Sequence, residues 1–419
     1  MRRPFSAGVW SNRAFVRLWT GQSVSAFGSY ISVVAVPLLA IGSLHARAAD
    51  MGVLGAASRL PFLLYVFAGV FVDRTRRRQV MIGADLIRAA LLLLIPVAVL
   101  TGVLSLWLLA AAWFAVQALE VWFETASMSY LPSLVERGQL LDANTGLEGS
   151  LAAAQTAGPG LGGLLVQAVS APVALVADAV SFLASAFMVW RIGGGEPAPA
   201  PAAGPGVRGV LTDVAEGFQF IGSQRALLPL AIAIAVMNVV WAAEVALYVL
   251  FLVRDLGLPA SLLGLTLAGA GPGALVGTAL AGPVQRRVGL SAAIVGGLTT
   301  FAVSALLIPA APAVPAVAVP MLTASGFLMA LDGQVCAVNV ITARQVLTPD
   351  RLQGRVNASF HFLILGLSPA GSVAGGLLGQ AIGVRPALLV AVAGMFVAPL
   401  LVLASPVRGV REVAPVEAS

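Results

Sequence analysis

The segment Gly69-Val70-Phe71-Val72-Asp73-Arg74-Thr75-Arg76-Arg77-Arg78 places one aspartate and four arginines between two long apolar stretches. These stretches, residues 51–72 and 80–102, are each long enough to cross the ~30 Å hydrocarbon core of a bilayer as a helix. Arginines in a short turn between two membrane helices remain in water, and such turns lie predominantly on the cytoplasmic side. The segment therefore predicts an all-α polytopic membrane protein with this turn in the cytoplasm.

The composition favours the same fold class. Of the 419 residues, 59% are hydrophobic and 10% are charged, whereas soluble domains have about 25% charged residues. The net charge of +6 comes from arginines in short turns between apolar stretches and not from one basic face. The chain is therefore expected to contact membrane lipid and no nucleic acid.

The residue types that the sequence lacks exclude several chemistries. It contains no lysine, so neither a Walker A phosphate loop nor a Schiff-base lysine can form. The single cysteine, Cys336, permits no internal disulfide, and two histidines, His45 and His361, are too few for a histidine-based metal site. We therefore expect no cofactor, no metal and no enzymatic activity.

Hydropathy predicts twelve membrane-spanning helices in two groups of six. The predicted spans are 18–44, 51–73, 80–102, 104–129, 143–168, 172–192, 226–252, 261–283, 290–311, 313–340, 356–382 and 385–406. They divide the chain into an N-terminal six-helix bundle (1–192), a cytoplasmic linker (193–224), a C-terminal six-helix bundle (225–407) and a cytoplasmic tail (408–419). The linker begins with Pro, Ala and Gly, and its second part, Val207–Ser223, is either an amphipathic helix on the membrane surface or a lead-in to span seven.

The arginine distribution predicts the orientation. With both termini in the cytoplasm, 19 of the 24 arginines fall on the cytoplasmic side, and three, Arg47, Arg254 and Arg385, fall outside. The other two, Arg59 and Arg88, lie within spans. Because this asymmetry is strong, we expect both termini in the cytoplasm. The expected location is the cytoplasmic (inner) membrane of a bacterium.

The two halves repeat a set of landmarks at nearly one spacing. Gly69 corresponds to Gly282 and Asn144 to Asn357, each 213 residues later, and Pro159 has a counterpart 210 residues later. Landmarks in the same order at nearly one offset indicate a duplicated six-helix unit. Transporters built from such parallel repeats hold their substrate between the halves, near the bilayer midplane.

Several stretches also match patterns of one transporter superfamily. They are the turn motif (Gly69, Asp73, Arg74, Arg77 and Arg78, with Arg76 in place of the usual glycine), Asn12-Arg13-Ala14-Phe15, Gly158-Pro159-Gly160-Leu161-Gly162-Gly163 and Asp178-Ala179-Val180-Ser181-Phe182-Leu183. On these residues the chain resembles the major facilitator superfamily over essentially its whole length. Within it, the chain is similar to the bacterial drug:proton antiporters, which include macrolide-efflux proteins and siderophore exporters.

The resemblance implies a major facilitator fold, a monomer, and transport by alternating access of two bundles. It implies that the turn motif acts as a conformational latch between the halves. It also implies that Gly158, Pro159, Gly162 and Gly163 let helices approach closely and bend. The chain departs from many of these antiporters in span four, which contains no arginine.

Carboxylates inside the predicted spans are the candidates for proton coupling, because ionised groups in a bilayer are costly and need a function or a partner. In span four, Gln117, Glu120, Glu124 and Ser127 are three or four residues apart and form one polar stripe on a helix. Two carboxylates one turn apart repel each other, so Glu120 or Glu124 can carry a proton near neutral pH. Glu124 alternatively pairs with a cytoplasmic arginine. Asp332 in span ten is a further proton-coupling candidate.

Other polar residues within spans are candidates for the substrate cavity. They are Gln22, Ser25 and Ser29 in span one, Arg59 in span two, Gln117 in span four, and Asn238, Trp241 and Glu244 in span seven. An aromatic ring beside a carboxylate suits a cationic or amphipathic substrate, although serines also join helices and aromatic stripes also pack cores. Arg59 is expected to balance Glu120, an anionic group of the substrate, or a structural partner. Asp85 and Arg88, three residues apart, are expected to form an internal ion pair.

Together these features predict a secondary active transporter that exports hydrophobic or amphipathic small molecules, driven by protons. Its expected partners are a small-molecule substrate, protons and membrane lipid, and its expected oligomeric state is a monomer. Two alternatives remain open. One is an importer or lipid-handling facilitator of the same fold, and the other is a membrane-embedded sensor that transports nothing.

Overall fold

The structure, a computed structural model, describes residues 8–72, 74–193 and 207–406, which form helices and turns and contain no strand. The N-terminal half comprises α1 (Arg13–Ser43), α2 (Ala48–Arg59), α3 (Tyr65–Val72), α4 (Arg77–Leu100), α5 (Leu106–Leu134), α6 (Leu140–Ala168) and α7 (Ala171–Trp190). The linker helix is α8 (Val207–Ser223). The C-terminal half comprises α9 (Leu227–Leu250), α10 (Ala260–Ala268), α11 (Ala270–Val288), α12 (Leu290–Ala305), α13 (Leu307–Ala310), α14 (Pro315–Leu347), α15 (Gln353–Gly366), α16 (Ser368–Ile382), α17 (Val384–Met395) and α18 (Val397–Leu403).

Ten helical segments in the described part of the chain are long and apolar enough to cross a membrane, which confirms the all-α polytopic fold class. The two remaining predicted spans, two and five, are helical but do not belong to these ten segments. Span two is divided, because α2 ends at Arg59 and a 3-10 segment, Leu60–Leu64, separates it from α3. Pro61 accounts for this break, since proline lacks a backbone N–H and disfavours α geometry in the residue before it. Span five lies within α6, which contains several glycines and glutamines.

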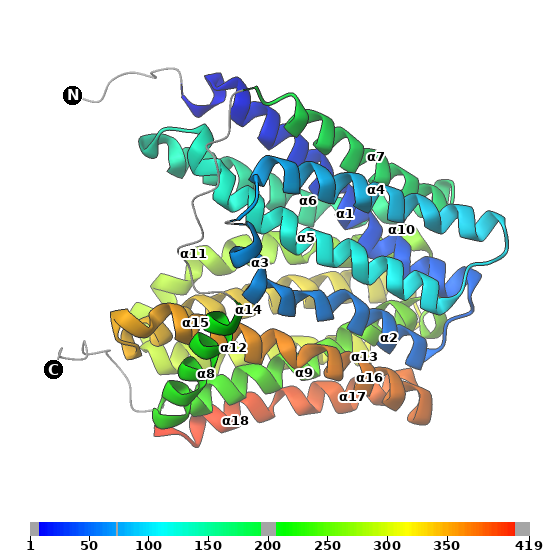
Figure 1. Cartoon of the computed structure of the whole chain (residues 1–419). Helices are drawn as coiled ribbons and strands as arrows, with labels where there is room; N and C mark the ends of the chain where they lie inside the picture. Colours follow the sequence, from blue (N-terminus) through cyan, green and yellow to red (C-terminus); the bar gives the residue numbers. More distant parts are fainter. Residues whose placement is uncertain (1–7, 73, 194–206, 407–419) are drawn as a thin grey trace.

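The long helices run side by side, and the N-terminal half lies mostly above the C-terminal half in Figure 1. The helix α1 begins and α18 ends at the same end of the molecule, on the left in Figure 1, which we call the terminal end. We call the other end, on the right in Figure 1, the opposite end. The turns between α3 and α4, between α5 and α6, and between α11 and α12 lie at the terminal end in Figure 1, and the first two carry Arg76 and Arg137.

The two halves meet through small residues near the opposite end. The helix α2 packs on α16, and α6 packs on α10. A Cβ added to Gly52 would lie 2.7 Å from the carbonyl oxygen of Ser372, and a Cβ on Gly163 would clash with the carbonyl oxygen of Ala260. Glycine at these positions therefore permits a close approach of the backbones, as at small-residue interfaces between membrane helices.

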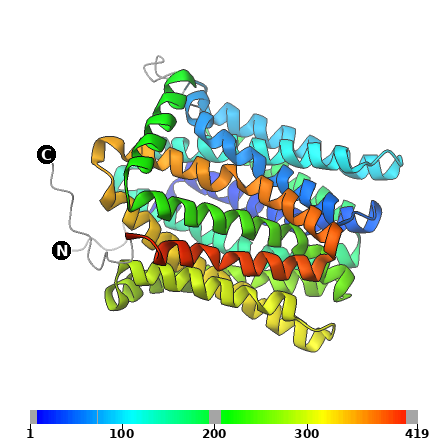
Figure 2. The same ribbon diagram turned by 90° about the horizontal axis from the view of Figure 1, so that it is seen from below.

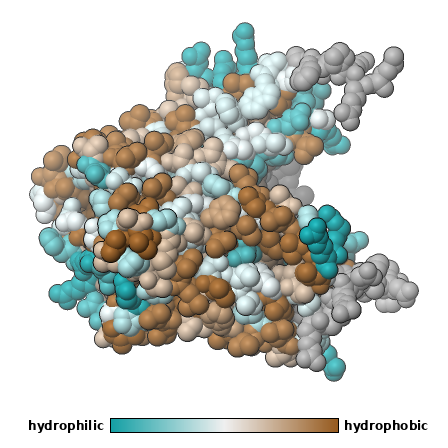
Figure 3. Space-filling model, turned by 180° about the vertical axis from the view of Figure 1, so that it is seen from behind, coloured by the Kyte–Doolittle hydropathy of each residue, from teal (hydrophilic) through white to brown (hydrophobic). Residues whose placement is uncertain are grey.

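The surface of the molecule is largely apolar, as Figure 3 shows for the face seen from behind. Leu164, Leu377 and Leu400 are 58%, 58% and 61% exposed, respectively. Soluble monomers rarely expose contiguous apolar surface on this scale. The exposed leucines and valines therefore fit a lipid-facing surface.

The linker helix α8 packs against the C-terminal half and runs steeply across the long helices in Figure 2. Arg355 of α15 forms ion pairs with Asp213 (2.8 Å) and Glu216 of α8. The Ser359 hydroxyl donates a hydrogen bond to the Val214 carbonyl oxygen (2.8 Å). The sequence analysis left two alternatives for residues 207–223. The structure shows a further arrangement, in which α8 docks on the terminal end of α15.

Candidate functional site

A buried charge cluster lies among α1, α4, α5 and α7 of the N-terminal half. Arg88 of α4 is 1% exposed, and its guanidinium forms ion pairs with Asp85 (3.4 Å) and with Glu120 of α5. The guanidinium carbon also lies 3.8 Å from the centroid of the Phe182 ring of α7. The expected pair of Asp85 and Arg88 is therefore present, and Arg88 additionally serves Glu120.

A third carboxylate, Asp178 of α7, completes the cluster. It is 1% exposed and accepts hydrogen bonds from the hydroxyls of Ser32 and Ser181, the latter at 3.1 Å. It interacts electrostatically with Arg88 and Asp85. One arginine therefore faces three carboxylates, and full ionisation would leave two negative charges uncompensated. Such an excess is costly where water is excluded.

Glu120 is the member of the cluster with access to the surroundings. Its side chain is 37% exposed, whereas those of Asp85 and Arg88 are 0% and 1% exposed. The hydroxyl of Ser29 of α1 lies 3.5 Å from Arg88 Nη2. Asp85 and Asp178 are therefore enclosed, whereas Glu120 is partly exposed.

The polar stripe predicted on span four faces neighbouring helices along its length. Glu124 is exposed and accepts a hydrogen bond from the Tyr65 hydroxyl of α3, which is the contact that the described residues show for it. The Gln22 amide of α1 donates to the Ser127 hydroxyl. Gln117 is half-buried one turn before Glu120. Among the described residues, Glu124 forms no ion pair with the arginine of the cluster.

A second charged group joins the two halves. Arg59, at the last residue of α2, lies over the Trp241 ring of α9, with the guanidinium carbon 5.1 Å from the ring centroid. Glu244 of α9 is 3% exposed and interacts electrostatically with Arg59. The hypothesis that Arg59 balances Glu120 is therefore wrong for this structure, because Arg88 occupies that role.

The remaining predicted site residues are dispersed. Ser25 is buried in α1. The Asn238 amide donates to the Ile234 carbonyl oxygen of its own helix (2.9 Å). Asp332 of α14 accepts a hydrogen bond from the Ser304 hydroxyl of α12 (3.3 Å), within the C-terminal half. Asp332 is thus separate from the cluster around Arg88.

The turn motif is described in part, since Asp73 lies outside the described residues. The Arg78 guanidinium donates hydrogen bonds to the carbonyl oxygens of Val189 (3.1 Å) and Trp190, at the end of α7. Arg78 therefore satisfies carbonyl groups left open at a helix C-terminus. A Cβ on Gly69 would meet no described atom within 4 Å. A latch between the halves stays a prediction.

The glycine-proline segment of span five makes close contacts and stays helical. The helix α6 continues through Pro159. A Cβ on Gly162 would lie 3.0 Å from the Ile31 Cα of α1, and Gly158 faces the Tyr30 side chain. Close packing on α1 and α10 is thus the observable property of this segment.

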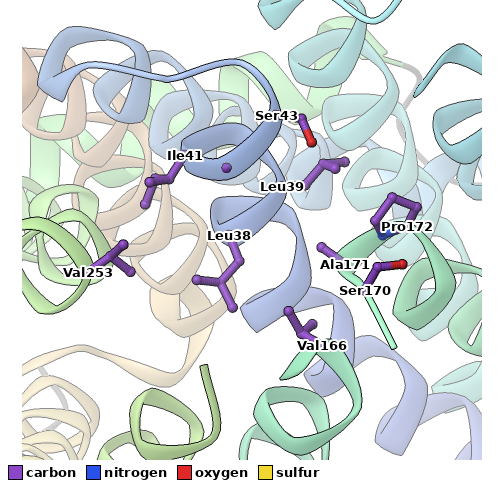
Figure 4. Close-up of a pocket in the computed structure, with 10 residues that line it drawn as sticks. Leu38, Leu39, Ile41, Ser43, Val166, Ser170, Ala171, Pro172 and Val253 are labelled. Atoms are coloured by element: carbon purple, nitrogen blue, oxygen red, sulfur yellow. The ribbon is translucent and has the colours of Figure 1, made fainter. Parts of the chain in front are cut away.

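An apolar pocket of about 330 Å³ opens near the opposite end (Figure 4). Its lining comes from α1, α6, α7 and Val253, and includes Leu38, Leu39, Val166 and Pro172. None of the predicted site residues lines it. It supplies an apolar surface without a charged group.

Two features of the candidate site escaped the sequence analysis. Asp178 appeared there only within a matched pattern, although an aspartate in a predicted span is itself a signal of function. The pairing of Glu120 with Arg88 joins different helices, and residue spacing along one helix cannot reveal it. Trp241 and Glu244 were identified, but their partner Arg59 comes from the other half.

Comparisons with known proteins agree with this architecture. Residues 6–418 match the family MFS_3, described as transmembrane secretion effectors. The MFS-type transporter YfiS of Bacillus subtilis is 26% identical over 91% of this chain and 90% of its own length. Macrolide efflux protein A of Streptococcus pyogenes is 35% identical over 30% of this chain and 31% of its own length.

Solved structures share the fold. A nucleoside transporter, NupG, superposes with a TM-score of 0.77 at 10% identity, over 94% of this chain and 99% of its own. A bacterial homologue of the lysosomal transporter Spinster, in an inward-facing occupied conformation, gives a TM-score of 0.72 at 14% identity, over 97% of this chain and 98% of its own. Because the match to the family extends over nearly the whole chain, the protein belongs to the transmembrane secretion effector family of major facilitator transporters.

Proposed function

We propose that this membrane transporter exports hydrophobic or amphipathic small molecules by alternating access, driven by protons. The observation that carries the proposal is the cluster of one arginine and three carboxylates in the N-terminal half. An excess of buried carboxylates is a general means of binding and releasing protons, because their charge is stabilised in one environment and not in another.

Glu120 is the proposed entry point for the proton. When Glu120 is ionised, it holds Arg88 between α5 and α4. When Glu120 is protonated, that attraction is lost, and Arg88 is left to Asp85 and Asp178 alone. Protonation thus changes the force between α4 and α5, and a change of this kind can bias a two-state equilibrium between conformations.

Export is favoured over import by the comparisons. The family is described as secretion effectors, and one relative is a macrolide efflux protein. The halves are in close contact near the opposite end, through glycines of α2 and α6. With both termini in the cytoplasm, this closed end would face outward, and the substrate of an exporter would enter such a state from the cytoplasm or the inner leaflet.

Transport in inverted membrane vesicles tests this proposal. Acidification of the vesicle interior by respiration should drive uptake of a macrolide such as erythromycin, since the former cytoplasmic face points outward. Nigericin, which collapses the pH gradient, should abolish the uptake. Uptake that persists after the gradient has been collapsed would contradict proton coupling, and uptake driven only in right-side-out vesicles would contradict export.

Three carboxyl-to-amide variants connect the transport to the cluster. Glu120→Gln should remove the dependence on the pH gradient. Glu148→Gln, an exposed position on α6, is the matched control and should behave as the unchanged protein. Asp332→Asn separates the C-terminal candidate from the cluster, because its contact is Ser304. Loss of coupling in Asp332→Asn alone would move the proton site to the C-terminal half.

A further inference from the structure

Trp241 and Glu244 lie on one face of α9, within the C-terminal half. Because they are three residues apart on one helix, their side chains project to the same side. Glu244 is 3% exposed, and no ion pair within 4.0 Å is present for it in the described part of the chain. The Phe301 ring of α12 packs edge-on against Trp241, with centroids 6.4 Å apart at 82°. The face therefore combines an aromatic surface with a buried carboxylate.

The cation on this face comes from the other half of the molecule. Arg59 lies 5.1 Å from the Trp241 centroid, within the range of a cation–π contact. It is also the cation that interacts electrostatically with Glu244. A buried ionised carboxylate that loses its counter-charge is strongly destabilised, so a cation on this face stabilises the ionised form of Glu244.

Arg59 is anchored where the chain changes geometry. The helix α2 ends at Arg59, and the 3-10 segment Leu60–Leu64 with Pro61 follows directly. A 3-10 stretch within a longer helical segment often marks a hinge. Since α2 belongs to one half and α9 to the other, relative motion of the halves also moves Arg59 with respect to Trp241.

We propose that Trp241 and Glu244 bind the cationic group of an amphipathic substrate, and that Arg59 occupies this site when no substrate is bound. This inference rests on the proposed transport function and names its substrate class. The compounds it predicts carry one positive charge, as an ammonium, phosphonium or protonated amine, next to an apolar body. Such a group replaces the guanidinium on the ring and balances Glu244, whereas a neutral or anionic compound cannot take over both contacts of the guanidinium.

The proposal predicts opposite effects for the two charges. Arg59 competes with the substrate, so its removal tightens the binding of a cation. Glu244 attracts the substrate, so its removal weakens that binding. If instead Arg59 bound an anionic substrate, its removal would weaken the binding of an anion and leave cations unaffected.

Equilibrium dialysis of the purified full-length protein in detergent measures these effects. The probes are tetraphenylphosphonium and tetraphenylborate, which share shape and apolar surface and differ in charge. Arg59→Gln should bind tetraphenylphosphonium about tenfold more tightly, which is within the range of a desolvated cation–π contact. Glu244→Gln should bind it about tenfold more weakly, and Trp241→Leu should also weaken it. Arg254→Gln, an exposed arginine in the C-terminal half, should leave both affinities unchanged.

The double variant Arg59→Gln/Glu244→Gln is the control for misfolding of Arg59→Gln. Arg59→Gln alone leaves Glu244 without its counter-charge, whereas the double variant leaves no net charge behind. In the double variant, the tighter tetraphenylphosphonium binding expected of Arg59→Gln should be lost. Weaker phosphonium binding in a folded Arg59→Gln protein, or a loss of borate binding alone, would overturn the proposal. Equal phosphonium binding in all variants would also overturn it.

The outcome is separable from that of the proposed function. Dialysis measures binding without a pH gradient. The charge-dependent pattern without proton-driven transport would leave the cation site intact and contradict proton coupling. Proton-driven transport without this charge-dependent pattern would support proton coupling and contradict the cation site.

Discussion

Arg88 of α4 and Glu120 of α5 form an ion pair across two membrane helices, with Arg88 1% exposed and Glu120 37% exposed. This asymmetry places a fully buried cation behind a carboxylate that the surroundings can reach. Asp85 and Asp178 lie on the buried side of the same arginine. The pair is therefore the boundary between the accessible and the enclosed parts of the cluster.

Removal of the Arg88 charge is predicted to destabilise the fold. Arg88→Gln leaves three carboxylates without a cation, and the removal of one partner from a buried pair costs about 3–5 kcal/mol. A clear fall in the thermal unfolding midpoint of the detergent-solubilised protein is expected. Adding Asp85→Asn should recover part of the loss, because it removes one uncompensated carboxylate. An unchanged midpoint in Arg88→Gln would show that the cluster is not held by this charge.

Contact between the halves is predicted to depend on Gly163. A Cβ at this position clashes with the Ala260 carbonyl oxygen of α10, whereas a Cβ at Gly160, on the same helix, meets nothing within 4 Å. Gly163→Val should therefore disfavour closure near the opposite end and abolish transport, at a cost of about 1–3 kcal/mol to this conformation. Gly160→Val is the control and should transport normally. Transport by both variants would mean that α6 and α10 need not approach this closely.

Docking of α8 is predicted to depend on Arg355. Its ion pairs with Asp213 and Glu216 involve side chains that are 36–44% exposed, so their contribution to stability is about 1 kcal/mol or less. Arg355→Gln should thus leave the unfolding midpoint nearly unchanged and accelerate hydrogen exchange in residues 212–223. Arg351→Gln, an exposed arginine in the preceding turn, is the comparison. Equal exchange in both variants would indicate that the apolar contacts of α8 hold it alone.

The single cysteine provides a test of the packing in the C-terminal half. Cys336 of α14 is 5% exposed, and a Cβ on Gly297 of α12 would lie 3.1 Å from its Cβ. A thiol that solvent cannot reach reacts slowly, so N-ethylmaleimide should modify the native protein little and the denatured protein fully. Rapid modification of the native protein would show that α12 and α14 separate there.

Helix positions could be predicted from the sequence because hydropathy reports directly on the bilayer. Predicted spans such as 290–311 and 385–406 agree with α12–α13 and α17–α18 to within a few residues. The break after Arg59 was not predicted, although Pro61 signals it. The docking of α8 was missed because it depends on a tertiary contact with Arg355.

The candidate site was predictable in its members and not in its pairings. A charge in an apolar span identifies Glu120, Arg88 and Glu244 one by one. Which helices bring them together is decided by the packing of α4 on α5 and of α2 on α9. Residue spacing along one helix revealed only the pair of Asp85 and Arg88, three residues apart.

The central claim is that Glu120 carries the coupled proton, and proton flux in proteoliposomes tests it most directly. A pH-sensitive dye inside the vesicles should report proton movement when erythromycin or tetraphenylphosphonium is added to the unchanged protein. Glu120→Gln should lose this proton movement while it still exchanges labelled substrate across the membrane, and Glu148→Gln should retain both. Proton movement of normal size in Glu120→Gln would contradict the account.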